Sequence, residues 1–277
     1  MAYKLYNYNP SGGAAIPVAA LFGLTTVIHI VQMVRARSWF MIPFTIGGVF
    51  EAVGYLCRYI NSTETPDWQT TPYIGQSLLI LLAPALFAAS IYMILGRLIV
   101  ALNASSNSII RPSWLTKIFV IGDVLSFLMQ CGGGGYLASA KTQDSVDMGE
   151  YMILGGLFVQ IFFFGFFIIF SVIFHRRMLA SPMNYVGGSQ IPWVRCMKVL
   201  YTVSCLIMIR SIYRVIEYAQ GSGGSLQSKE AFVYVFDAAL MLACCIVFVI
   251  SHPSKMLGEQ GYQKPEELEM LATHYGR

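Results

Sequence analysis

Charged residues are scarce in this sequence. Asp, Glu, Lys and Arg make up only 12% of its 277 residues, whereas a soluble globular protein has about a quarter. Hydrophobic residues account for 56% of the chain, and the mean hydropathy is +0.61. This balance excludes an ordinary soluble protein and indicates a multi-span membrane protein. The formal charge of +4 gives no reason to expect a nucleic-acid partner.

Several functional signatures are also missing. The cysteines form no Cys-x-x-Cys motif and no paired framework, which argues against a disulfide scaffold. No G-x-x-x-x-G-K-[ST] loop occurs, so ATP binding is not expected. The start, MAYKLYNYNPSGGAAIP, has no basic region followed by an apolar core. We therefore expect the first apolar segment to act as the targeting signal. No internal repeat supports an inverted-repeat transporter.

Seven apolar segments are long enough to cross a bilayer, which takes about 20 residues per helix. They lie near residues 16–34, 39–60, 73–101, 115–139, 150–174, 195–219 and 231–251. The sequence therefore predicts an all-α integral membrane bundle of seven transmembrane helices. It divides into an extracellular segment (1–15), the transmembrane domain (16–251) and a cytosolic tail (252–277), with a short helix expected at 265–274.

Lysine and arginine are distributed unevenly between the two sets of connections. Twelve lie at one side of the predicted bundle and three at the other, and the remaining three of the eighteen lie within spans. Basic residues favour the cytosolic side. The asymmetry predicts that the N-terminus is outside and the C-terminus is in the cytosol. We expect the plasma membrane, with internal membranes as the alternative.

Charged residues nevertheless occur inside the spans. They are Glu51, Arg58, Asp123, Arg210, Arg214, Glu217 and Asp237. Each costs about 2.5–3.5 kcal/mol at the centre of an inserting helix, so seven unpaired charges would cost about 20 kcal/mol. That exceeds the net stability of most proteins. These residues must therefore pair with one another, face water, or both.

Their spacing supports pairing. Glu51 and Arg58 are seven residues apart, so they share one helix face. Arg210, Arg214 and Glu217 also share a face, and the last two are close enough to touch. Asp237 has the same seven-residue relation to Glu230.

Glutamines on three further spans add uncharged polar groups. A polar cavity that opens to the outside and closes toward the midplane would gather all of these side chains. The predicted substrate-binding residues are Glu51, Arg58, Gln76, Gln130, Gln160, Arg210, Arg214, Glu217 and Asp237. The alternative is that the ion pairs only hold helices together. Asp123 stands apart, and it could form an inner gate with Arg97 or cap a helix.

These residues also belong to motifs that resemble a known family. The motifs are Tyr8-Asn9-Pro10-Ser11, Glu51-x-x-Gly54-Tyr55-x-x-Arg58, Leu82-Ala83-Pro84 with Ala88-Ala89, Tyr92-x-x-x-Gly96-Arg97, Asp123-Val124-x-Ser126-x-x-x-Gln130, Gly132 to Gly135, Gly156-Leu157-x-x-Gln160, Arg210-x-x-Tyr213-Arg214-x-x-Glu217 and Tyr234-x-x-Asp237. In this order they resemble the fungal lipid-translocating exporter family, also called the resistance-to-aminocholesterol family. The likeness runs from about residue 6 to His252-Pro253.

The resemblance implies a seven-span fungal protein that moves or extrudes amphiphiles such as sphingoid bases, sterol-like or porphyrin-like compounds and toxins, and confers resistance to them. It is therefore not expected to be an enzyme. The expected partners are membrane lipids and amphiphilic small molecules. We hypothesise that a cationic amine sits among Glu51, Glu217 and Asp237, with arginines holding these carboxylates ionised when the site is empty.

Two alternatives stay open. The span count and orientation also suit a membrane sensor or receptor that binds an amphiphile without moving it, although no Asp-Arg-Tyr or Asn-Pro-x-x-Tyr motif is present. A metal-dependent lipid hydrolase would need zinc ligands. His29, His175, His252 and Asp123 lie toward the cytosolic side, but no His-x-x-x-His pair occurs. We expect no metal and no cofactor.

Overall fold

The computed structural model describes residues 8–64, 68–105, 108–140, 142–180, 192–221, 224, 226 and 229–257. The predicted helix at 265–274 lies outside these residues. The described part is helical and contains no strand. Its long helices are α1 (Gly12–Arg35), α2 (Ile42–Thr63), α3 (Thr70–Ala101), α4 (Pro112–Ala138), α5 (Gln143–Ala180) and α6 (Trp193–Ala219).

The seventh span consists of three consecutive pieces. They are the short helix α7 (Glu230–Val233), the π-helical segment η4 (Tyr234–Ala238) and α8 (Ala239–Ile250). With this span counted as one, the described residues contain seven helices that are long and apolar enough to cross a membrane. The predicted seven-helix bundle is confirmed, and the chain is a multi-pass membrane protein.

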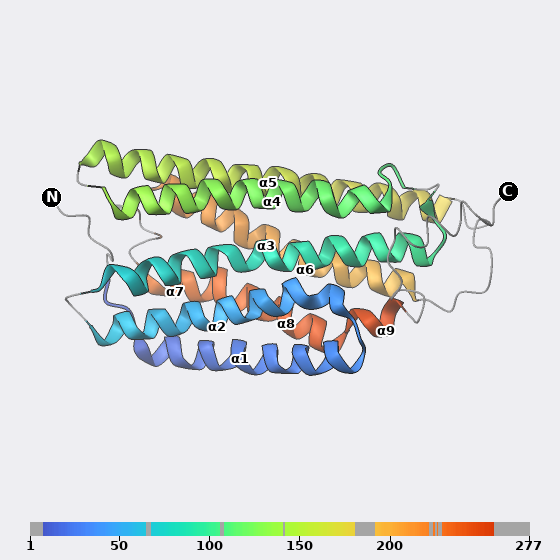
Figure 1. Cartoon of the computed structure of the whole chain (residues 1–277), viewed down its shortest axis with the longest axis horizontal. Coiled ribbons are helices and arrows are strands. Elements are labelled where there is room, and N and C mark those ends of the chain that lie inside the picture. The colour runs from blue at the N-terminus through green and yellow to red at the C-terminus, as the bar shows by residue number, and fades with distance from the viewer. Residues whose placement is uncertain are drawn as a thin grey trace.

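The helices run roughly side by side along the long axis of the molecule (Figure 1). We call the end at which α1 begins the N-terminal end of the bundle; α3, α5 and α7 begin there too. Helix α5 starts earlier and ends later than predicted, and its 38 residues span about 57 Å. It is therefore much longer than a hydrocarbon core of about 30 Å.

The surface of the bundle is apolar, as lipid contact requires. Ile121, Phe162 and Ile250 are each more than 60% exposed. The interior contains a large aromatic cluster in which Tyr92 packs against Phe119 and Phe167. Apolar residues on both the surface and the interior are what a helix surrounded by lipid and by other helices should show.

A short link between α1 and α2 lies at the opposite end of the bundle. A 3-10 turn, η1 (Trp39–Met41), joins α1 to α2. The short helix α9 (Pro253–Leu257) follows α8, and its Met256 and Leu257 are buried against the bundle. The first residues of the predicted tail therefore pack on the transmembrane helices.

Candidate functional site

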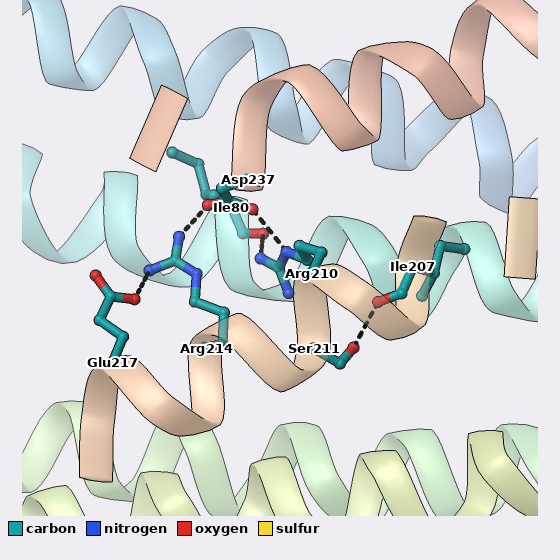
Figure 2. Close-up of polar contacts among 7 residues, drawn as sticks. All are labelled: Ile80, Ile207, Arg210, Ser211, Arg214, Glu217 and Asp237. Carbon is teal, nitrogen blue, oxygen red and sulfur yellow. Dashed lines mark hydrogen bonds and ion pairs between the residues drawn. The ribbon is translucent and has the colours of Figure 1, made fainter. Parts of the chain in front are cut away.

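Four charged residues form one buried network between α6 and the seventh span (Figure 2). Arg210 Nε donates to Asp237 Oδ1 at 2.6 Å, and Arg214 Nη2 donates to Asp237 Oδ2. Arg214 Nη1 donates to Glu217 Oε2 at 2.9 Å. Arg210 and Asp237 are fully buried. The contact between Arg214 and Glu217 confirms the pairing that their spacing predicted.

A proline on α3 explains how Arg210 is held. Pro84 lies inside α3 and has no backbone N–H, so the carbonyl group of Ile80 loses its usual helical partner. Arg210 Nη2 donates to that carbonyl oxygen at 2.7 Å. The Arg210 guanidinium group therefore donates to the Ile80 carbonyl oxygen, which has no helical partner on α3, and also pairs with a carboxylate on the seventh span.

The π-helical segment places Asp237 in this network. Residues 234–238 form i to i+5 hydrogen bonds, which insert an extra residue into the turn. Asp237 then faces α6, while Glu230, one segment earlier, faces α2. Such π segments are frequent at functional sites. The apolar length of the span does not predict this segment.

Arg58 belongs to a second cluster at the N-terminal end of the bundle. Its Nη2 donates to Glu230 Oε1 at 2.8 Å and to the hydroxyl group of Tyr8 at 2.7 Å. Its Nε donates to the hydroxyl group of Tyr234 at 3.2 Å. The Ser11 N–H donates to both carboxylate oxygens of Glu230. The segment before α1 is thereby fastened to α2 and α7.

Glu51 lies close to the buried network of Arg210, Arg214 and Asp237, and it differs from every charged residue in the two clusters. It shares the buried face of α2 with Arg58, as predicted. Its side chain is fully buried, and neither carboxyl oxygen has a hydrogen-bond partner among the described residues. Asp237, Arg210 and Arg214 are close enough to act on it electrostatically. The hydroxyl group of Tyr55, one turn away, also lacks a partner within the described part of the chain.

The three glutamines are placed differently. Gln76 is buried on α3. Gln130 Nε2 donates to Gln160 Oε1 at 3.2 Å and to Ser126 Oγ at 2.7 Å, which joins α4 to α5. The described contacts thus gather the charged residues of α2, α6 and the seventh span into one region, and pair Gln130 with Gln160 in another.

Some members of the charged clusters were not among the predicted site residues. Tyr8, Tyr234 and Glu230 contact Arg58, and Ile80 contacts Arg210. Pro84, four residues after Ile80, could have indicated that the Ile80 carbonyl group lacks its usual helical N–H partner. The partners of Arg58 come from distant parts of the chain, so spacing alone could not identify them.

Three cavities lie elsewhere, along α3, α4, α5 and α6. The first holds about 500 Å³ of empty space, including the part that opens to the surroundings, and is lined by Leu78, Gln130 and Tyr218 among others. A narrower space of about 150 Å³ is lined by Gln130 and Asp123. A third, of about 480 Å³, includes Tyr218 and Glu150 in its lining.

The three histidines that the structure describes lie within hydrogen-bonding distance of other groups of the protein. His29 Nε2 lies 3.1 Å from the carbonyl oxygen of Cys245, and His175 Nδ1 lies 3.2 Å from the hydroxyl group of Tyr201. His252 Nδ1 lies 2.6 Å from Ser254 Oγ. Burial and the nearby Lys255 lower the pKa of His252 to about 4. In the described part of the chain, no three His, Cys, Asp or Glu side chains are grouped as a metal site would require.

These features define a helical multi-pass membrane protein whose spans are joined by buried ion pairs. Residues 44–260 match the profile of the RTA1-like protein family, and the chain belongs to that family. It is 38% identical to the protoporphyrin uptake protein 1 of Saccharomyces cerevisiae, over 90% of this chain and 91% of that protein.

Two further relatives are named as transporters. The probable lipid transporter atnI of Emericella nidulans is 28% identical, over 92% of this chain and 68% of its own. The sphingoid long-chain base transporter RSB1 of Saccharomyces cerevisiae is 24% identical, over 86% of this chain and 70% of its own. No solved structure matches the chain. The family predicted from the motifs is confirmed.

Proposed function

We propose that this protein moves amphiphilic molecules, especially those with a long chain and a cationic amine, across or out of a fungal membrane. Family membership and the names of its relatives support this class of substrate. Seven spans with an apolar surface support the location. We place the N-terminal end of the bundle outside the cell, because the basic residues favour the opposite side.

The proposal depends on one observation, the burial of the Glu51 carboxyl group without a hydrogen-bond partner among the described residues. A buried carboxyl group without a hydrogen-bond partner is costly, and native proteins retain few of them. Among the described residues Glu51 has no hydrogen-bond partner, while Asp237 and Glu217 already accept hydrogen bonds from arginines. We infer that a cationic head group meets Glu51, and that the arginines hold the neighbouring carboxylates in place.

The remaining predicted residues would act around this group. Arg58 holds the N-terminal segment over α2 and α7 through Tyr8 and Glu230. Release of these contacts would uncover the N-terminal end of the region around Glu51. We propose that the movement uses no nucleotide and no cofactor, and that the chain catalyses no reaction.

The test replaces Glu51 with Gln in cells that depend on this protein for resistance to a toxic cationic amphiphile. Glu51→Gln keeps the size of the side chain and removes its charge. We expect resistance and uptake to be lost while the amount of protein in the membrane stays normal. Glu64→Gln, at the end of α2, is the matched control and should behave as wild type. Normal resistance in Glu51→Gln cells would contradict the proposed site.

A further inference from the structure

The charges of the buried network balance without Glu51. The network contains two arginines and two carboxylates that pair with one another, namely Arg210, Arg214, Glu217 and Asp237. Both positive charges are therefore already compensated by carboxylates on α6 and the seventh span. An ionised Glu51 would add a further negative charge to this buried region, where Asp237 is already close enough to repel it.

The other elements packed around α2 do not supply the missing positive charge. Arg58 Nη2 lies 2.8 Å from Glu230 Oε1, so the second cluster is balanced as well. Helices α1 and α3 also pack against α2. The charged residues within them are Arg35 and Arg97, which lie near their C-terminal ends and so at the opposite end of the bundle. Among the described helices, no cation is therefore placed to compensate Glu51 alone.

Uncharged titratable groups near Glu51 do not bind its carboxyl group either. The thiol groups of Cys244 and Cys245 on α8 and the hydroxyl group of Tyr55 are close enough to act on it electrostatically. His29 of α1 lies 3.1 Å from the carbonyl oxygen of Cys245 instead. Both oxygens of Glu51 lack a hydrogen-bond partner in the described part of the chain. The environment therefore does not stabilise a carboxylate at this position.

A buried carboxyl group in such surroundings becomes neutral by taking up a proton, because the ionised form has lost its water and has gained no hydrogen bonds. Asp237 shows the contrast. It is equally buried, but two arginines donate hydrogen bonds to it and compensate its charge. The hypothesis drawn from the sequence has Glu51 ionised in the empty site, and the charge balance does not support this.

Polar groups lead from Glu51 toward the N-terminal end of the bundle. Tyr55 lies one turn further along α2, and its hydroxyl group has no partner among the described residues. Its ring stacks on that of Tyr234, with 6.0 Å between the centroids. The hydroxyl group of Tyr234 accepts a hydrogen bond from Arg58, which also pairs with Glu230. Glu230 is 17% exposed, so this series of groups reaches the surroundings of the protein.

We propose that Glu51 is a proton-binding site, which holds a proton while the site is empty and releases it in exchange for a cationic ligand. In this exchange the O–H bond of the carboxyl group breaks, its electron pair stays on the carboxylate, and the proton passes to water at the N-terminal end. The cation takes the place of the proton, so the net buried charge does not change. A pH difference across the membrane would then drive the cation in the direction opposite to the proton.

The bound proton follows from the charge balance, whereas the exchange rests on the proposed function. The first experiment therefore uses no ligand. It records infrared spectra of the purified protein at neutral pH in a detergent without ester groups. A protonated carboxyl group has a C=O stretching band that a carboxylate lacks, and this band shifts in heavy water.

We expect the difference spectrum between wild type and Glu51→Gln to contain this band. The difference spectrum between wild type and Glu64→Gln should not contain it, because Glu64 follows the last turn of α2, away from the buried network. Absence of the band from the first spectrum would overturn the proton site.

Thermal unfolding gives a second test of the same site. Gln resembles a protonated carboxyl group in size and charge, so Glu51→Gln should unfold at the same temperature as wild type at neutral pH. Asp237→Asn makes the same kind of change in a carboxylate that pairs with two arginines, and it should unfold at a lower temperature. A fall for Glu51→Gln as large as that for Asp237→Asn, or failure of Glu51→Gln to fold, would show that Glu51 is ionised and would overturn the proposal.

The exchange is measured in sealed vesicles that contain the protein and enclose a pH-sensitive dye. The probe is radiolabelled dodecyltrimethylammonium, whose quaternary nitrogen has no proton and so cannot carry one across. When the probe is added outside, we expect the interior to become alkaline as the cation enters and protons leave. This change should be several-fold faster with wild type than with Glu51→Gln, and Glu64→Gln should match wild type.

The two kinds of measurement separate this inference from the proposed function. A proton on Glu51 in a protein that moves no cation would support the proton site and contradict the proposed transport. Entry of the labelled cation without any change of internal pH would support the proposed transport and overturn the exchange.

Discussion

Replacement of Asp237 by Asn tests the energetic role of the buried network most severely. Asp237 is fully buried and accepts hydrogen bonds from both Arg210 and Arg214. Asn has the same shape but no charge, and it has one acceptor oxygen in place of two. Both guanidinium groups would stay buried without the negative charge that compensates them, and the single amide oxygen of Asn would replace the two carboxylate oxygens that Arg210 and Arg214 now use.

Removal of one partner from a buried ion pair costs about 3–5 kcal/mol, because the other charge stays buried without compensation. For a chain of this size that corresponds to a fall in unfolding temperature of roughly 10 °C. The assay is thermal unfolding of the purified protein in a mild detergent, with Asp144→Asn as the exposed control. That control should change the free energy of unfolding by less than about 0.5 kcal/mol.

A double variant isolates the pair itself. Arg210→Gln together with Asp237→Asn removes both charges, so the combined loss should be smaller than the sum of the two single losses by about 0.5–3 kcal/mol. If Asp237→Asn unfolds at the same temperature as Asp144→Asn, or if the two losses simply add, the network does not stabilise the bundle as described.

Three further predictions concern other parts of the bundle. Gly133→Ala places a Cβ atom 2.8 Å from the backbone of α5, so it should lower the free energy of unfolding by about 1–3 kcal/mol, as measured by thermal unfolding. Gly135→Ala should lower it by well under about 1 kcal/mol, because no atom lies within 4 Å of its added Cβ. Equal effects would contradict the close packing of α4 on α5. Tyr8→Phe removes a hydrogen bond to Arg58 and should speed proteolysis of the N-terminal segment without unfolding the bundle; unchanged proteolysis would show that this contact does not fasten the segment. His252 has a pKa of about 4 in the folded protein and about 6.5 when unfolded, so its contribution to stability is present above pH 6.5 and is lost as the pH falls. His252→Gln should therefore reduce the loss of stability between about pH 6.5 and 5.5 by up to about 1 kcal/mol. Parallel curves of stability against pH for the two proteins would refute this.

The sequence was informative wherever the signal is local. Apolar length predicts each of the seven spans, and three-residue spacing predicts the contact between Arg214 and Glu217. The shared face of Glu51 and Arg58 follows from helical periodicity in the same way. Such patterns repeat within one helix, so they need no knowledge of its neighbours.

The remaining features depend on how separate helices meet. Arg58 pairs with Glu230, 172 residues away, and no periodicity connects the two positions. The π segment around Asp237 changes the local winding of the seventh span, which apolar length alone does not predict. Asp123, for which the sequence left two roles open, lines a small space that α3, α4 and α5 enclose together.

The most direct test of transport uses the protein reconstituted into sealed vesicles of neutral phospholipid. A fluorescent long-chain amine is added to one side, and its arrival at the other leaflet is followed by chemical quenching of the accessible label. We predict that the amine crosses several-fold faster in vesicles with the protein than in protein-free vesicles, and that Glu51→Gln abolishes the difference. Equal rates of crossing with and without the wild-type protein would contradict the account.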